Sequence, residues 1–300
     1  MLYQQIARNK RKTWGLLAIF MVILILVGAG LGYLLDNRPT TGIVIAGIGS
    51  CIYLFIIYQD SASLVMRMNH AEEIHEQDNP QLWHIVEDMA LVAQVPMPRV
   101  YIVPDKSPNA FATGRDPEHS AVAVTTGLLA LLDREELEGV LGHELSHVRN
   151  YDIRVSTIAV ALVAVISFIS GFASRYVWWF GGGRSRRDSN DKNESPITLI
   201  IKIVAILFVF ILGPLTATLV QMALSRNREY LADASSVALT RNPHGLISAL
   251  QKIEGSQPMK QADPSSAGLY FESPFKRGHR TSWFATHPAT SDRISRLEKM

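Results

Sequence analysis

Four long stretches without a charged residue alternate with polar segments along the chain. They cover residues 14–35, 39–59, 155–174 and 203–225 and are 22, 21, 20 and 23 residues long. As helices with a rise of about 1.5 Å per residue, all four match the roughly 30 Å hydrocarbon core of a bilayer. The pattern therefore predicts four transmembrane helices, grouped as two hairpins.

Two alternatives apply to these stretches. Any one of them is compatible with a buried helix of a soluble protein, and the first is compatible with a cleavable signal peptide. The apolar region of a signal peptide spans about 7–15 residues. Residues 14–35 exceed that length and a second apolar stretch begins a few residues later, so we favour membrane helices.

The composition agrees with a membrane protein and limits its chemistry. Of the 300 residues, 48% are hydrophobic and 19% are charged, against roughly 25% charged in soluble domains. The net charge is +2 and the basic residues do not gather on one face, so we expect no nucleic-acid partner. The single cysteine, Cys51, excludes an internal disulfide framework and a cysteine-rich metal site. A metal would need histidine and carboxylate ligands.

The basic residues also predict an orientation in the membrane. Residues 36–38, between the first two stretches, carry one positive charge, whereas four precede the first stretch: Arg8, Lys10, Arg11 and Lys12. The positive-inside rule then places the N-terminus in the cytoplasm. The same topology puts the connection between the third and fourth stretches outside, although it holds Arg175, Arg184, Arg186, Arg187, Lys192 and Lys202. A second hairpin that lies on the membrane, or enters it only in part, is therefore left open.

A mostly polar segment separates the two hairpins, and its first part has the apolar spacing of an amphipathic helix over residues 70–95. The inward candidates in this helix are Leu82, Ile85, Met89 and residues 91–93.

Three short β-rich segments follow, at residues 99–104, 109–114 and 120–127, and Pro, Gly and Asp separate them. Such segments predict a small antiparallel sheet. The fold class predicted is thus α+β and mainly helical.

The sequence "GVLGHELSHVRN", residues 139–150, carries the chemistry. A helix is expected to begin at Asp133, because Glu136 three residues on completes a capping box. On this helix His143 and His147 share a face, so both imidazoles can bind one ion, while Glu144 is rotated by about 100° and can reach a water beside it. Chance yields this spacing in about one comparable chain in a hundred, so two ordinary helical histidines remain the alternative.

Two histidines and a water leave a tetrahedral zinc ion one protein ligand short. The segment "SRNREYLADASSVAL", residues 225–239, offers Glu229 and, four residues later, Asp233. Glu229 can coordinate a metal, and Asp233, one turn on, can accept a hydrogen bond from a ligand imidazole. The alternative is a solvated helix face whose acids pair with Arg226 or Arg228.

Topology connects the two candidate ligand segments. His147 lies eight residues before the third apolar stretch and Glu229 four residues after the fourth, so they stand about 12 Å and 6 Å from the membrane boundary along helices. An even number of crossings between them, as in a two-span hairpin, brings both to the same membrane face.

These features resemble the HtpX family of integral membrane zinc endopeptidases, which is related to the membrane CAAX prenyl endopeptidases. The resemblance covers nearly the whole chain, from the basic N-terminus and its two spans to the C-terminal "FATHPATSDRI". It implies a gluzincin-like catalytic domain on the cytosolic face of the inner membrane and one zinc ion per chain. It also implies proteolysis of misfolded or damaged membrane proteins as part of quality control and the stress response.

The resemblance also implies residue roles. His143, His147 and Glu229 would be the zinc ligands and Glu144 the general base. His287 and Arg293 would lie near the active site, where a donor can stabilise an oxyanion; a plain helix start at Pro288 is the alternative. Residues 109–114 resemble the family's substrate-binding edge strand, to which an extended peptide adds, the alternative being a simple buried strand.

The predicted organisation has four parts. Residues 1–59 form the basic segment and first hairpin, and 60–154 the first part of the catalytic domain. Residues 155–225 form the second hairpin, and 226–300 the second part of the catalytic domain. The expected partners are peptide or protein substrates and the lipid bilayer. The rival functions are a metal-free membrane scaffold of the same architecture and a different zinc hydrolase.

Overall fold

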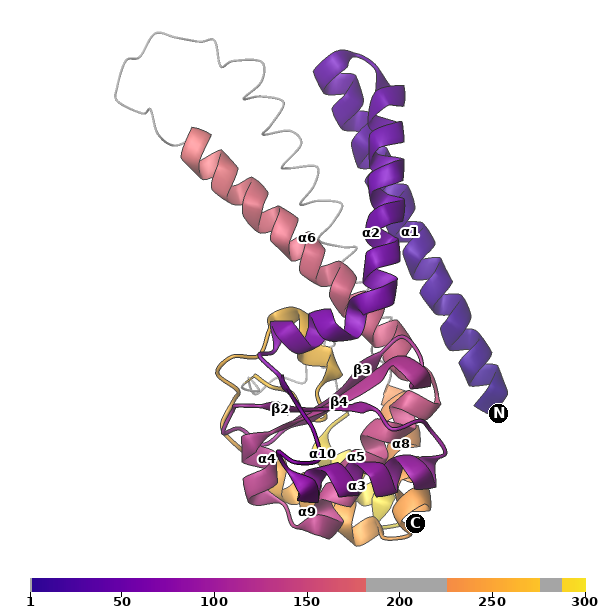
Figure 1. Ribbon diagram of the computed structural model, residues 1–300, viewed down its shortest axis with the longest axis vertical. Helices are drawn as coiled ribbons and strands as arrows, with labels where there is room; N and C mark the ends of the chain where they lie inside the picture. The colour runs from indigo at the N-terminus through magenta and orange to yellow at the C-terminus, as the bar shows by residue number, and fades with distance from the viewer. Residues whose placement is uncertain (1, 182–225, 276–287) are drawn as a thin grey trace. The chain divides into compact units, whose positions relative to one another are not determined.

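The computed structural model of the chain describes residues 2–181, 226–275 and 288–300 (Figure 1). Its described residues divide into two compact units. One unit takes in those of Trp14–Ile57 and Leu162–Leu219, and the other those of Met1–Thr13, Tyr58–Ala161 and Val220–Met300. The first is built from long apolar helices, and the second holds the sheet and the candidate site.

Two helices are long and apolar enough to cross a membrane among the described residues: α1 (Leu2–Asp36), in its part Ile6–Gly30, and α2 (Pro39–Met68). Their backbones approach closely, since a Cβ added at Gly32 would lie 2.7 Å from the amide nitrogen of Gly42. Small residues allow this approach between membrane helices. The structure therefore contains the helices of the first predicted hairpin.

The third apolar stretch also forms a helix, α6 (Asp152–Gly181). Its crossing of a membrane remains a prediction. The fourth stretch, residues 203–225, and most of the basic connection before it lie outside the described residues.

The second unit contains a four-stranded sheet of β1 (Glu72–Ile74), β2 (Arg99–Val103), β3 (Ala110–Gly114) and β4 (Ser120–Thr125), in the order β1-β2-β4-β3. Strands β2 and β4 run parallel, and the two outer pairs are antiparallel. The prediction of an antiparallel sheet is therefore wrong, and the sheet is mixed. Alternating side chains identify a strand and its two faces but not the direction of its neighbour.

The helix predicted over residues 70–95 is shorter in the structure. Residues 72–74 form β1, and α3 (Pro80–Ala93) begins only after Asn79, whose side chain caps it with Pro80 in the first turn. Proline and a capping asparagine mark a helix start. The predicted inward residues Leu82, Ile85, Met89 and Ala93 are buried, but Leu91 and Val92 are exposed.

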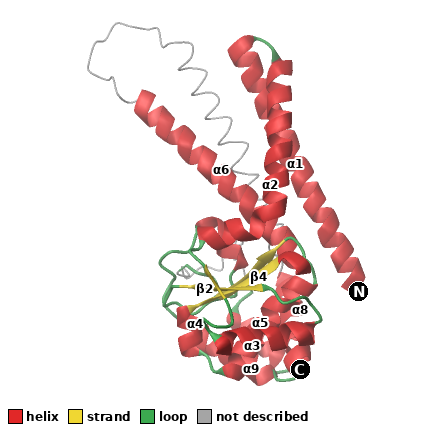
Figure 2. Ribbon diagram, in the orientation of Figure 1, coloured by secondary structure: helices red, strands yellow, loops and turns green. Residues whose placement is uncertain are grey.

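The central helix of the second unit is α5 (Arg134–Arg149), which packs against α3, β3, α8 (Arg226–Thr240) and α9 (Pro243–Ile253) (Figure 2). The predicted capping box is present: Asp133 accepts from the amide of Glu136, and the Glu136 side chain accepts from the amide of Asp133. Gly139 lets α9 approach, because a Cβ there would lie 2.9 Å from the amide nitrogen of Leu246.

The remaining described elements of this unit are short. They are α4 (Thr126–Leu131), α10 (Thr290–Leu297) and two 3₁₀ helices, η1 (Pro117–His119) and η2 (Pro264–Leu269). A buried apolar core joins α3, α5 and α9 to one face of the sheet through residues such as Ile85, Val122, Leu141, Leu145 and Leu250.

Candidate metal centre

The two histidines of α5 meet on one face of the helix, as their spacing predicts. The Nε2 atoms of His143 and His147 lie 3.2 Å apart, and the ring planes are inclined at 83°. His143 is 1% exposed, whereas His147 is half-buried and borders a cavity.

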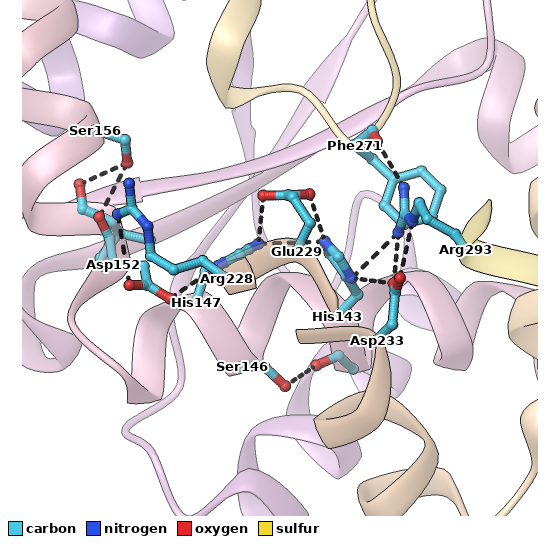
Figure 3. A network of polar contacts seen from close by, with 12 residues as sticks. His143, Ser146, His147, Asp152, Ser156, Arg228, Glu229, Asp233, Phe271 and Arg293 are labelled. Atoms are coloured by element: carbon cyan, nitrogen blue, oxygen red, sulfur yellow. Dashed lines mark hydrogen bonds and ion pairs between the residues drawn. The ribbon is translucent and has the colours of Figure 1, made fainter. Parts of the chain in front are cut away.

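Helix α8 brings Glu229 to these nitrogens from 82 or more residues away in sequence. Its Oε2 lies 3.6 Å from Nε2 of His143, and its Oε1 lies 3.6 Å from Nε2 of His147. One ligand atom from each of the three residues lies within 4.8 Å of the others. In Figure 3 the Glu229 carboxylate faces both imidazoles. The three predicted ligands are thus together in space.

The separation of these atoms fits a small tetrahedral cation. Two ligands about 2.1 Å from a tetrahedral zinc ion are roughly 3.4 Å from each other, and the observed separations are 3.2 and 3.6 Å. The Nδ1 atom of each histidine faces a carboxylate, so a neutral imidazole that carries its proton on Nδ1 would direct its Nε2 lone pair toward the other histidine and Glu229. Such a concentration of lone pairs is stabilised by a bound cation.

Asp233 lies beside His143, one helical turn beyond Glu229. Its Oδ1 is 2.9 Å from Nδ1 of His143, the contact that the sequence predicts for a ligand-orienting carboxylate. The Arg293 guanidinium donates to both oxygens of Asp233, at 2.6 and 2.9 Å. Burial disfavours the charge on Asp233, but Arg293 and His143 outweigh it and lower the pKa of Asp233 to about 2.

The same carboxylates act on the first histidine. Burial disfavours the charged imidazole of His143, yet hydrogen bonds to Asp233 and Glu229 outweigh burial and raise the pKa of His143 to about 9. Two acids therefore hold a positive charge at this position. The same two carboxylates would also attract a metal cation bound beside His143.

Asp152, the first residue of α6, is the partner of the second histidine. Its Oδ2 lies 3.2 Å from Nδ1 of His147. The side chain is buried, and it also lies 3.6 Å from Nη1 of Arg228. Each histidine thus has its own carboxylate. Helical spacing gives no signal for this pair, because a turn between α5 and α6 separates the two residues.

Glu144 borders the same cavity as the three candidate ligands. It is 2% exposed, and burial raises its pKa above the ordinary glutamate value. The backbone of Ala112 on β3 and the two histidines oppose this rise in the pKa, but burial outweighs them. The cavity volume of about 30 Å³ is enough for one or two waters.

Strand β3 lies at an edge of the sheet, as predicted for residues 109–114. Its outer edge is already occupied. The carbonyl of Ala110 accepts from the amide of Phe271 at 2.7 Å, and Phe111 forms an antiparallel bridge with Tyr270. The Asn109 side chain binds both the amide and the carbonyl of Glu272. We call residues 268–272 the strap; its members Gly268, Leu269, Tyr270 and Phe271 also line the cavity.

The structure describes only one of the two C-terminal residues predicted near the active site, His287 and Arg293. His287 lies outside the described residues. Arg293, on α10, is 0% exposed, and besides Asp233 it reaches the carbonyl of Phe271 at 3.3 Å and Nδ1 of His143 at 3.3 Å. It is not among the residues that line the cavity. The structure therefore places Arg293 behind His143 rather than at the opening.

Two imidazoles and a carboxylate that converge beside a buried glutamate are the arrangement of a metalloprotease, and here it occurs in a chain with two helices suited to a membrane. The model of "Peptidase family M48" matches residues 76–300. The chain belongs to peptidase family M48, and within that family to the HtpX proteases.

Its relatives show how much of the chain this similarity covers. It is 70% identical to a "Protease HtpX homolog" of Lactobacillus acidophilus and 71% identical to one of Lactobacillus helveticus, in each case over 100% of both chains. A crystal structure of S. mikatae Ste24p is similar with a TM-score of 0.48 and 17% identity, covering 94% of this chain and 67% of that one. The family assignment makes the protein a membrane metalloprotease, and the family implies a metal.

Proposed function

We propose that the protein is a zinc endopeptidase in which His143, His147 and Glu229 hold the metal and Glu144 is the general base. The observation that carries this proposal is the convergence of the two Nε2 atoms and the Glu229 carboxylate. Bound zinc supplies Lewis-acid chemistry, which polarises a peptide carbonyl and acidifies water.

The protein's own residues have separate tasks in this proposal. Glu144 accepts a proton from the attacking water at its carboxylate and returns it to the nitrogen of the leaving amine. A carboxyl group with a raised pKa holds that proton between the two transfers more readily than an ordinary glutamate. Asp233 and Asp152 fix the tautomer of the imidazoles by accepting from Nδ1. Arg293 acts through Asp233, because its burial keeps it from the substrate.

We also propose that the catalytic unit faces the cytoplasm and that its substrates are misfolded or damaged membrane proteins. The basic N-terminal segment supports the orientation, and the apolar helices α1 and α2 support a substrate in the same membrane. The four-part organisation, with boundaries at 59/60, 154/155 and 225/226, and the oxyanion role of His287 belong to the same proposal.

The central test compares zinc content and casein cleavage in detergent for the parent protein, Glu144→Gln and Glu138→Gln. Glu138 lies on the same helix and pairs with Arg134 at the surface, so it is the matched control. We expect all three proteins to bind one zinc ion and only Glu144→Gln to lose cleavage, by at least about 100-fold. Equal cleavage by Glu144→Gln and the parent would refute the assigned base. Absence of zinc from the parent would favour the metal-free scaffold.

The topology has its own test. Cysteines placed at Ser185 and Ser189 in a Cys51→Ser background are probed with a thiol reagent that does not cross the membrane. The four-span topology predicts labelling from the outside. Labelling from the cytoplasmic side alone would show that the second hairpin does not span.

A further inference from the structure

A residue that precedes the first apolar stretch reaches the back of the candidate metal centre. Asn9 on α1 is 4% exposed, and its Nδ2 donates to Oδ1 of Asp152 at 2.8 Å and to the carbonyl of Asn150 at 3.1 Å. Both partners are acceptors, so they use the two hydrogens of one amide nitrogen. Asn9 therefore joins the two ends of the turn between α5 and α6.

That turn contains a strained residue. Tyr151 has a φ of +58°, a left-handed conformation that residues other than glycine rarely adopt. Such a conformation persists where surrounding contacts determine it. Asn9 supplies contacts on both sides of Tyr151, and the next residue, Lys10, lies over the Tyr151 ring at 4.5 Å.

The turn determines where Asp152 points. Asp152 follows Tyr151 directly, and its two oxygens have different partners. Oδ2 faces Nδ1 of His147. Oδ1 accepts the hydrogen bond from Asn9 and lies near Arg228. Because an ionised carboxylate only accepts hydrogen bonds, His147 donates to Asp152 from Nδ1, and its Nε2 faces the site. Asn9 thus binds the carboxylate that orients the His147 imidazole.

We propose that Asn9 is a positioning residue of the metal centre, which acts through Asp152 and the Tyr151 turn to aim His147 at the ion. The N-terminal segment before the first apolar stretch is then part of the catalytic unit and not only a membrane-orienting signal. This inference rests on the proposed role of His147 as a metal ligand.

The size of the expected effect follows from the position of Asn9 in this chain of contacts. Loss of a partner that directly supports a ligand lowers metal affinity by about 10- to 100-fold, which is the expectation for Asp152→Asn. Asn9 acts one contact further back, through a single hydrogen bond to that carboxylate. We therefore expect Asn9→Ala to weaken zinc binding by about 3- to 10-fold.

The experiment measures zinc affinity of the full-length protein in detergent by competition with a chelator, together with the thermal midpoint of the metal-free protein. The variants are Asn9→Ala, Asp152→Asn, the double variant and Arg11→Ala. Arg11 lies on the same segment with its side chain exposed, so it controls for general effects of altering the N-terminus. We expect Arg11→Ala to bind zinc as the parent does.

The double variant separates positioning from a structural role. If Asn9 acts through Asp152, Asn9→Ala weakens zinc binding in the parent but adds no further loss in the Asp152→Asn background. Unchanged affinity in Asn9→Ala, or an equal loss in both backgrounds, would overturn the inference. A fall in the metal-free thermal midpoint without a change in affinity would also overturn it, because it shows a purely structural role.

Two further outcomes have defined meanings. If the parent itself binds no zinc, the proposed function fails, whereas a parent that binds zinc and an Asn9→Ala variant that binds it equally well refute the inference alone. If Asn9→Ala does not fold, Asn9→Ser takes its place, since the shorter side chain cannot span both acceptors. Parent-like affinity in Asn9→Ser would then refute the positioning role.

Discussion

Removal of Arg293 tests how the buried polar contacts behind His143 stabilise the catalytic unit. Arg293 donates to Asp233 at 2.6 and 2.9 Å, and the side chains are 0% and 3% exposed. In Arg293→Met the Asp233 carboxylate remains buried and, of the hydrogen bonds it makes within the described part of the chain, keeps the one with His143. Loss of one partner of a buried ion pair costs about 3–5 kcal/mol, and each kcal/mol shifts the midpoint by about 2–4 °C in a domain of this size. We therefore expect the thermal midpoint to fall by roughly 6–20 °C.

A double-mutant cycle in the metal-free protein gives the decisive comparison. Asp233→Asn leaves Arg293 buried without its carboxylate, so it should destabilise to a similar degree. The double variant Asp233→Asn/Arg293→Met removes both charges and should be more stable than the sum of the two losses, by about 2–4 kcal/mol. Arg296→Met, on the exposed side of the same helix, serves as the control. Additive losses would show that the pair is not coupled and would refute this reasoning.

Two further changes probe the packing and charge around α5. Gly139→Ala should lower the thermal midpoint more than Gly142→Ala, because the new Cβ at position 139 would meet the backbone of Leu246 at 2.9 Å, whereas at Gly142 the nearest atoms are the ends of side chains. Such overpacking costs about 1–3 kcal/mol. Equal midpoints for the two variants would contradict the close approach. Burial opposes the charge on Glu136, but hydrogen bonds outweigh burial and lower the pKa of Glu136, with the bond from Lys252 the strongest of them. The ionised Glu136 side chain therefore contributes to stability above pH 4.5, and this contribution declines as the pH falls below that value. Thermal midpoints of the parent and Glu136→Gln should therefore differ by more at pH 7 than at pH 3, and a difference that does not change with pH would rule out this linkage.

The parts of the site that follow helical spacing could be predicted from the sequence. His143 and His147 lie four residues apart on one helix, as do Glu229 and Asp233, and in each case the structure places the pair as the spacing predicts. The start of α5 was equally predictable, because Asp133 bonds to residues within its own first turn. Local signals suffice where the interaction itself is local.

The remaining features depend on contacts that local patterns do not encode. Asp152 reaches His147 across a turn with a left-handed Tyr151, so helical periodicity does not relate the two. The parallel pairing of β2 with β4 depends on how the chain returns between strands, which alternation of side chains does not specify. Asn9 and Asp152 are 143 positions apart, and nothing in the N-terminal segment except its polarity distinguishes Asn9 from its neighbours.

The pairing of the strap with β3 bears on the prediction that an extended peptide adds to this strand. A substrate that aligns along β3 at Ala110 has to displace Phe271, which is attached to the same chain and therefore competes at an effective concentration in about the millimolar range. Tyr270 and Phe271 are each 1% exposed, so their displacement also uncovers apolar surface. Short, weakly bound peptides should be cleaved slowly for this reason, whereas a long unfolded segment can offset the cost with contacts elsewhere. If substrates do align along β3, this pairing would therefore select among them before any bond is broken.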